Sequence, residues 1–170
     1  MVLYPRAGSK VDAVSIPPGL PPGGLRQLID LRVSRVESLR PGVTEGVLLG
    51  TGGHTSTRWR ETLDIGAGVE VLARYADAAP ALVRQGRTRY LAGWFSAELQ
   101  RLVLEQAAID AGLSPVRLPD GLRLRRRGDL LFAFNYGDQV ALLDVPQAQW
   151  LVGSAAIAPQ GIGISRRLSS

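Results

Sequence analysis

Short apolar segments separated by tight turns fill the chain after Pro115, and this pattern restricts the region to antiparallel β structure. Leu122 and Leu124 alternate with Arg123 and Arg125, which is typical of a strand with one buried and one solvated face. Strands are expected at residues 122–126, 130–135, 140–143, 150–152 and 162–164. We therefore predict a small antiparallel β domain over residues 115–170, near the lower size limit for independent folding.

The arginines of this first strand could instead belong to a nucleic-acid patch. Proteins that bind single strands interleave aromatic side chains with basic ones, so that bases can stack. Here Phe132 and Phe134 share one face of the next expected strand, and we expect both in the core. The net charge of +5 is modest and indicates solubility. We therefore predict a solvated strand, no nucleic-acid partner, and a simple turn at Arg127-Gly128-Asp129.

The region before Pro115 mixes strands with helical segments. Expected strands cover residues 2–4, 31–36, 43–49, 69–75, 81–84 and 88–92, and a short amphipathic helix covers 25–29. Ser96 is the expected N-cap of the clearest helix, with Glu98 in its first turn and Gly112 at its end. The expected buried stripe of this helix is Leu99, Leu102, Val103 and Ala107. An α/β fold is therefore predicted for residues 1–114.

Few residues of the chain are candidates for catalysis or for binding a metal or cofactor. His54, the one histidine, has no flanking carboxylate at metal-ligand spacing and lies in Gly50–Ser56, an expected flexible loop. This loop lacks the lysine of a phosphate-binding loop. A triad with Ser56 or Ser96 lacks the G-x-S-x-G turn that exposes a nucleophile. We therefore predict no catalytic, cofactor-binding or metal-binding residue and no cofactor.

The chain of 170 residues has no cysteine, which excludes disulfides, thiolate metal sites and cysteine nucleophiles. No signal peptide is visible, and no apolar run of about 18 residues would span a bilayer. We therefore expect a cytoplasmic protein with no membrane partner.

Several segments, taken in order, resemble one known family. Arg126–Asp138, Trp150–Gly153 and Ala158–Ile164 resemble the C-terminal β domain of family 42 glycoside hydrolases, the bacterial β-galactosidases, although Tyr136 stands where the family usually has histidine. Upstream segments resemble the second half of the trimerisation domain of that family: Pro22–Val36, Trp59–Glu61, Val69–Asp77 and Ala81–Gly93.

This resemblance implies a partial glutamine-amidotransferase-like (Rossmann-like) α/β sheet over residues 1–114, followed by the β domain at 115–170. It also implies that both catalytic glutamates lie on a TIM barrel of about 250 residues that precedes everything seen here. Met1–Gly8 resembles a central strand of the family's trimerisation domain, so we expect the first half of that domain to be missing. The chain alone is therefore expected to be an inactive assembly region of a β-galactosidase.

The expected partner is a second copy of the chain, or the missing part of the parent enzyme. In trimers of the family this domain helps to wall the neighbouring active site, and Trp59, Tyr75 and Trp94 are interface candidates. We nevertheless expect all three in the core. The alternative is a freestanding carbohydrate-binding or protein-interaction module. The one tryptophan of the β tail, Trp150, is expected to be core.

Overall fold

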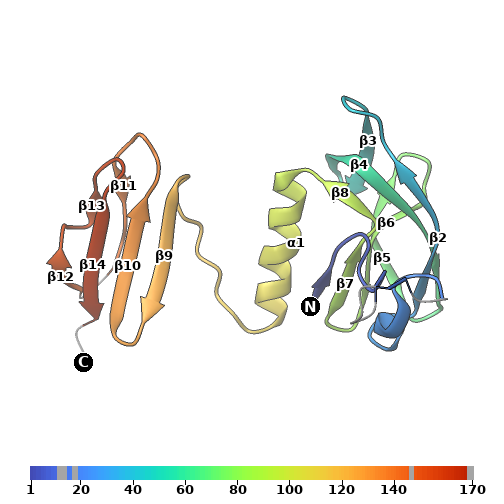
Figure 1. The fold of residues 1–170 in the computed structure, drawn as a ribbon, viewed down its shortest axis with the longest axis horizontal. Helices are drawn as coiled ribbons and strands as arrows, with labels where there is room; N and C mark the ends of the chain where they lie inside the picture. Colours follow the sequence, from blue (N-terminus) through green and yellow to red (C-terminus); the bar gives the residue numbers. More distant parts are fainter. Residues whose placement is uncertain (11–14, 17–18, 146–147, 168–170) are drawn as a thin grey trace. The chain divides into compact units, whose positions relative to one another are not determined.

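The computed structural model describes residues 1–10, 15–16, 19–145 and 148–167. The chain divides into two compact units, Met1–Pro115 and Val116–Ser170. Each unit has its own hydrophobic core. Figure 1 labels the helices and strands of each unit.

Unit 1 is built around an eight-stranded mixed sheet with the strand order β1-β7-β6-β5-β3-β4-β2, in which β8 also pairs with β4. The strands are β1 (Val2–Leu3), β2 (Leu31–Ser38), β3 (Thr44–Leu49), β4 (Gly52–Ile65), β5 (Glu70–Tyr75), β6 (Pro80–Gln85), β7 (Thr88–Leu91) and β8 (Gly93–Phe95). Among them β1 and β7 are parallel, and the other pairs are antiparallel.

The expected Rossmann-like α/β fold of residues 1–114 is wrong, because the unit is mostly β. A parallel sheet requires helical crossovers of a dozen or more residues between neighbouring strands. Here short turns join successive antiparallel strands, as at Gly86, whose φ of +54° suits the turn between β6 and β7. In the part of the chain that is described, α1 (Ala97–Asp110) is the one α-helix, and η1 (Gly23–Gln27) is a 3₁₀ turn in place of the amphipathic helix expected at 25–29.

The expected flexible loop at residues 50–56 is also wrong. A tight turn at Gly50 and Thr51 leads directly into β4, which continues for 14 residues. Leu49 pairs with Gly52 at the start of this hairpin. Gly50 has a φ of +58°, a conformation that glycine adopts without steric cost. The glycines therefore serve a hairpin turn, and the following residues form a ladder with β3.

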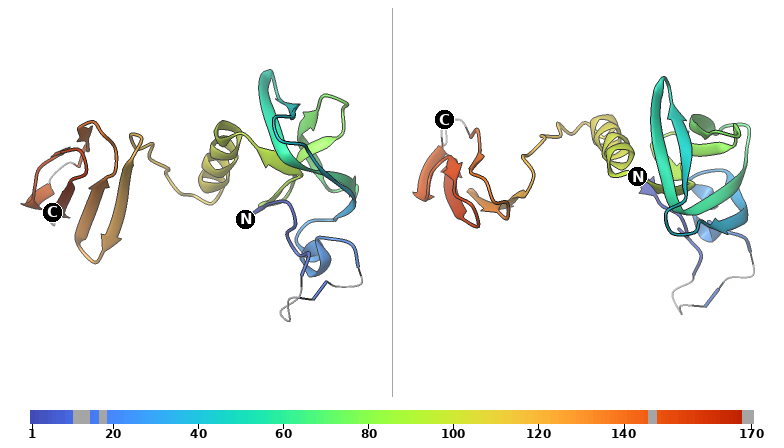
Figure 2. Two further views of the ribbon diagram at one scale, coloured as in Figure 1. Left: turned by 45° about the horizontal axis from the view of Figure 1, so that its top comes forward. Right: turned by 90° about the horizontal axis from the view of Figure 1, so that it is seen from above.

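Helix α1 begins and ends where the sequence predicts. The Ser96 Oγ accepts a hydrogen bond from the Leu99 N–H (3.4 Å), and Gly112, with a φ of +78°, follows the last turn. Leu99 and Val103 are fully buried against the sheet, whereas the other two residues of the expected stripe are half-buried. Figure 2 shows α1 lying along one side of the sheet of unit 1.

Unit 2 is all β, as predicted. A four-stranded antiparallel sheet has the order β12-β14-β10-β9, and a two-stranded sheet pairs β11 with β13. The strands are β9 (Leu122–Arg127), β10 (Leu130–Asn135), β11 (Ala141–Leu142), β12 (Ala148–Val152), β13 (Ala156–Ile157) and β14 (Ile162–Arg167). The turn predicted at Arg127-Gly128-Asp129 joins β9 to β10 and is confirmed. Strand β13 was missed, because two residues carry no periodic signal.

The phenylalanines of β10 do not lie in the core, contrary to the prediction. Ala133 and Asn135 are the buried residues of this strand, and Ala133 pairs with Leu124. Phe132 pairs with Arg125, so the half-buried phenylalanines share the outer face of the sheet with the exposed arginines of β9. The period-two alternation was recognised, but the wrong face of the strand was predicted to be buried. Ala133 faces the core, and the phenylalanines lie on the opposite face.

Candidate functional site

A buried carboxylate lies at the centre of unit 1. The Glu61 side chain, on β4, is 1% exposed. Its Oε2 accepts a hydrogen bond from the Tyr90 hydroxyl (2.7 Å), and its Oε1 accepts from the Trp59 indole N–H (3.1 Å) and the Arg6 backbone N–H (2.9 Å). A buried charge is tolerated only where hydrogen bonds replace its hydration, and three donors meet that need here.

These hydrogen bonds connect three segments that are distant in sequence. They join the N-terminal segment and β7 to β4, with sequence separations of 55 and 29 residues. Burial and the adjacent Glu61 carboxylate together raise the pKa of the Tyr90 hydroxyl far above its usual range, so this group remains a donor. The Glu61 carboxylate therefore acts as a structural acceptor.

A second polar cluster lies around Arg60, the neighbouring residue on β4. The Arg60 guanidinium pairs with Glu45 (3.0 Å) and Asp77, and it lies over the Tyr75 ring with its Cζ 4.3 Å from the centroid. Hydrogen bonding from Arg60 lowers the pKa of the Asp77 carboxyl. Burial raises the pKa of the Tyr75 hydroxyl, which donates to the Ala92 carbonyl (3.0 Å). The Arg60 guanidinium is thus shared between two carboxylates of the fold.

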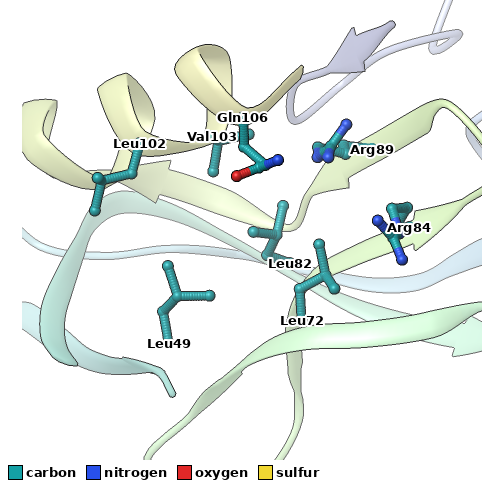
Figure 3. A pocket seen from close by; sticks show the side chains of 8 residues that line it. All are labelled: Leu49, Leu72, Leu82, Arg84, Arg89, Leu102, Val103 and Gln106. Atoms are coloured by element: carbon teal, nitrogen blue, oxygen red, sulfur yellow. The ribbon is translucent and has the colours of Figure 1, made fainter. Parts of the chain in front are cut away.

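A pocket of about 350 Å³ lies between α1 and the sheet (Figure 3). Its lining residues are Leu49, Leu72, Leu82, Arg84, Arg89, Leu102, Val103 and Gln106. Leucines from three strands form its apolar side, and helix residues including Gln106 lie across from them (Figure 3). No carboxylate is among these lining residues, so the pocket lacks the acid pair that glycoside hydrolysis requires.

The two arginines of the pocket are already engaged in ion pairs. The Arg84 Nε and Nη2 both donate to Glu70 Oε2 (3.0 and 2.6 Å), and the buried Arg89 pairs with Asp110. Hydrogen bonding from Arg89, with a smaller contribution from Gln106, lowers the pKa of the Asp110 carboxyl. The pocket is thus an apolar hollow with a charge-balanced end, which suits an apolar side chain better than a reacting polar substrate.

The candidate catalytic residues do not assemble into a triad. Ser96 Oγ is occupied as the cap of α1, and Ser56 is fully buried on β4. The His54 Nδ1 lies 3.8 Å from Glu98 Oε2. Within the described ranges, no group of three or more histidine, aspartate or glutamate side chains could hold a metal ion. Over the same residues, no helix combines the length and hydropathy needed to cross a bilayer.

The three aromatic interface candidates differ in how far their side chains are buried. Tyr75 is core, as expected, with 2% exposure. Trp59 is half-buried, and Trp94 is 45% exposed, so the core prediction is wrong for both. Trp150 is partly buried and packs against the core of unit 2. Gly93 and Phe95, on either side of Trp94, are both buried, so strand alternation directs the Trp94 side chain outward.

Residues 1–114 match the family model described as the β-galactosidase trimerisation domain. The chain is 43% identical over 166 residues to β-galactosidase BgaA of a Thermus species, and the match covers 96% of this chain and 25% of that protein. It is 42% identical over 161 residues to a β-galactosidase of Thermus thermophilus, covering 94% of this chain and 25% of the relative. The chain therefore spans about a quarter of the length of these relatives.

Solved structures agree with this assignment. The crystal structure of β-galactosidase from the psychrophilic Marinomonas ef1 superposes with a TM-score of 0.87 at 30% identity, covering 98% of this chain and 25% of that one. The β-galactosidase of Bacillus circulans sp. alkalophilus has a TM-score of 0.83 at 21% identity and covers 98% of this chain and 29% of that one, which shows the fold alone. The resemblance to family 42 β-galactosidases is confirmed, and the chain belongs to the family of the β-galactosidase trimerisation domain.

Proposed function

We propose that this chain is a subunit-assembly region of a β-galactosidase and that it has no hydrolytic activity of its own. The observation that carries the proposal is the match of residues 1–114 to the trimerisation domain. In such a role unit 1 associates with other copies, and unit 2 contributes packing surface through the outer face of its sheet. The cytoplasmic location and the lack of a nucleic-acid partner stay predictions.

The expected lack of activity rests on the surroundings of two carboxylates of unit 1, Glu61 and Asp110. A retaining glycosidase needs two carboxyl groups about 5–5.5 Å apart that face an open substrate site. Glu61 is enclosed and bonded to three donors, and Asp110 is held by Arg89. Both carboxylates therefore stabilise the fold, and neither lines the pocket beneath α1.

Multi-angle light scattering of the purified 170-residue chain tests the assembly role. We expect a mass that rises with concentration to a multiple of 18.2 kDa. A mass of 18.2 kDa that persists at about 100 μM would contradict the proposal. Hydrolysis of a chromogenic β-galactoside by the same sample would contradict the claim of inactivity.

The alternative of a carbohydrate-binding module is tested in the same preparation. Titration with galactose or lactose, followed by calorimetry, should show no saturable heat. Trp150 gives this alternative little support, since its ring packs against the core of unit 2 and leaves only part of its surface for a pyranose.

A further inference from the structure

Trp94 is an exposed tryptophan at a fixed position of unit 1. Its strand, β8, pairs with β4 through the register Thr57–Trp94 and Ser56–Phe95. The residues on either side of Trp94 are buried, so the alternation of the strand holds the indole on the outside. Aromatic side chains bury about 150–250 Å² when they pack, and a 45% exposed tryptophan leaves much of that area in water.

Trp94 belongs to a small cluster, here called the aromatic patch, of Tyr4, Arg6, Trp59 and Trp94. The rings of Tyr4 and Trp94 are 6.4 Å apart at 52°, and the Arg6 Cζ lies 5.5 Å from the centroid of the Trp59 ring. Tyr4 and Arg6 are two residues apart in the chain. Trp94 pairs with Thr57, which lies two residues before Trp59 on β4, so the two aromatic pairs come from adjacent strands.

The aromatic patch is held in place from beneath. The Arg6 backbone N–H and the Trp59 indole N–H both donate to Glu61 Oε1, at 2.9 and 3.1 Å. A surface that is ordered before binding loses less conformational entropy when a partner arrives. The buried carboxylate therefore prepares the patch for contact as well as stabilising the unit.

The composition of the patch fits a protein partner. Tryptophan, tyrosine and arginine are the residues most enriched at the energetic centres of protein interfaces. Arg6 is the one charged member, which is too little for a nucleic-acid surface. All four residues lie within the segment that matches the trimerisation domain, and a trimerisation domain assembles like subunits, which favours a second copy of the chain as the occupant.

We propose that the aromatic patch, centred on Trp94, is an anchor of the contact between copies of this chain. The inference rests on the proposed assembly function, and it adds the surface through which the copies meet. Truncating an anchor of this kind should weaken the contact at least tenfold, which corresponds to about 1.4 kcal/mol or more of binding free energy.

The test uses the 170-residue chain with Trp150→Phe, so that the remaining fluorescence comes from Trp59 and Trp94, both in the aromatic patch. The sample is diluted while mass is followed by sedimentation velocity and emission by fluorescence. We expect the emission maximum to move to longer wavelength at the concentration where the mass falls. Trp94→Ala should raise the dissociation constant at least tenfold. The control is Leu48→Ala, which removes a 54% exposed apolar side chain from β3, outside the aromatic patch.

The outcomes separate the inference from the proposed function. If the chain associates and Trp94→Ala leaves the dissociation constant unchanged, the aromatic patch is overturned while the assembly function stands. A chain that is monomeric at every concentration overturns both.

Far-UV circular dichroism confirms that the variant is folded, and Arg6→Ala provides a second variant that spares every buried side chain. Quenching by lactose without a change of mass would identify the patch as a sugar site and overturn the inference.

Discussion

Replacement of Glu61 by leucine should strongly destabilise unit 1. Leucine has a similar size but offers no acceptor, so the donors of Tyr90, Trp59 and Arg6 all lose their partner. Tyr90 is fully buried, and its hydroxyl has no route to water. The Trp59 indole and the Arg6 backbone lie nearer the surface and can recover part of their hydration.

The magnitude follows from these three donors. An unsatisfied buried donor costs about 1–3 kcal/mol, and a donor that regains water loses about 0.5–1.5 kcal/mol. The leucine side chain offsets part of this sum, because the charged carboxylate no longer has to be desolvated. We therefore expect a loss of about 3 kcal/mol in the free energy of unfolding, a large share of the stability of a small unit.

Urea unfolding in the Trp150→Phe background measures this loss, since the fluorescence then comes only from tryptophans of unit 1. With a slope of about 1–3 kcal/mol/M, the midpoint should fall by about 1–3 M. All proteins are compared at one low concentration, because association would add stability to the folded state. Glu61→Gln is the matched control: its carbonyl oxygen still accepts from two N–H groups, so about half of the loss is expected.

A free energy of unfolding for Glu61→Leu that stays within about 0.5 kcal/mol of the unsubstituted value would refute the reasoning. It would mean that the buried carboxylate contributes nothing beyond what an apolar side chain supplies. Equal losses for leucine and glutamine would instead show that the charge, and not the number of acceptors, is the stabilising feature.

Two further changes test other parts of the molecule. Asn135→Leu should destabilise unit 2 by about 2–4 kcal/mol, because the buried amide donates to three backbone carbonyls and accepts from one N–H. Urea unfolding measures the loss from the fluorescence of Trp150, with Trp59 and Trp94 both replaced by phenylalanine in the variant and its reference. Arg89 lowers the pKa of Asp110, so the folded chain binds this proton less readily than the unfolded chain. The stabilisation is present above about pH 4 and is lost as the pH falls through the lowered pKa; thermal scans from pH 6 to 2 should therefore show a shallower acid decline in Asp110→Asn.

The sequence alone was sufficient for the local elements. The cap at Ser96, the glycine that follows α1, the hairpin at Gly86 and the four longer strands of unit 2 depend on residues that are close together in the chain. Capping, turn geometry and alternation act over two to four residues, so the pattern contains the information that these elements need. The ordered set of segments likewise identified the β-galactosidase family.

Only the tertiary structure decided which side of each strand is buried and which residues meet. The alternation of β10 is visible in the sequence, but packing against Leu124 placed Ala133 inside and the phenylalanines outside. The Glu61 carboxylate is buried because its donors come from segments as far as 55 residues away. Both outcomes depend on long-range packing and on satisfying buried polar groups, and no local pattern records either of them.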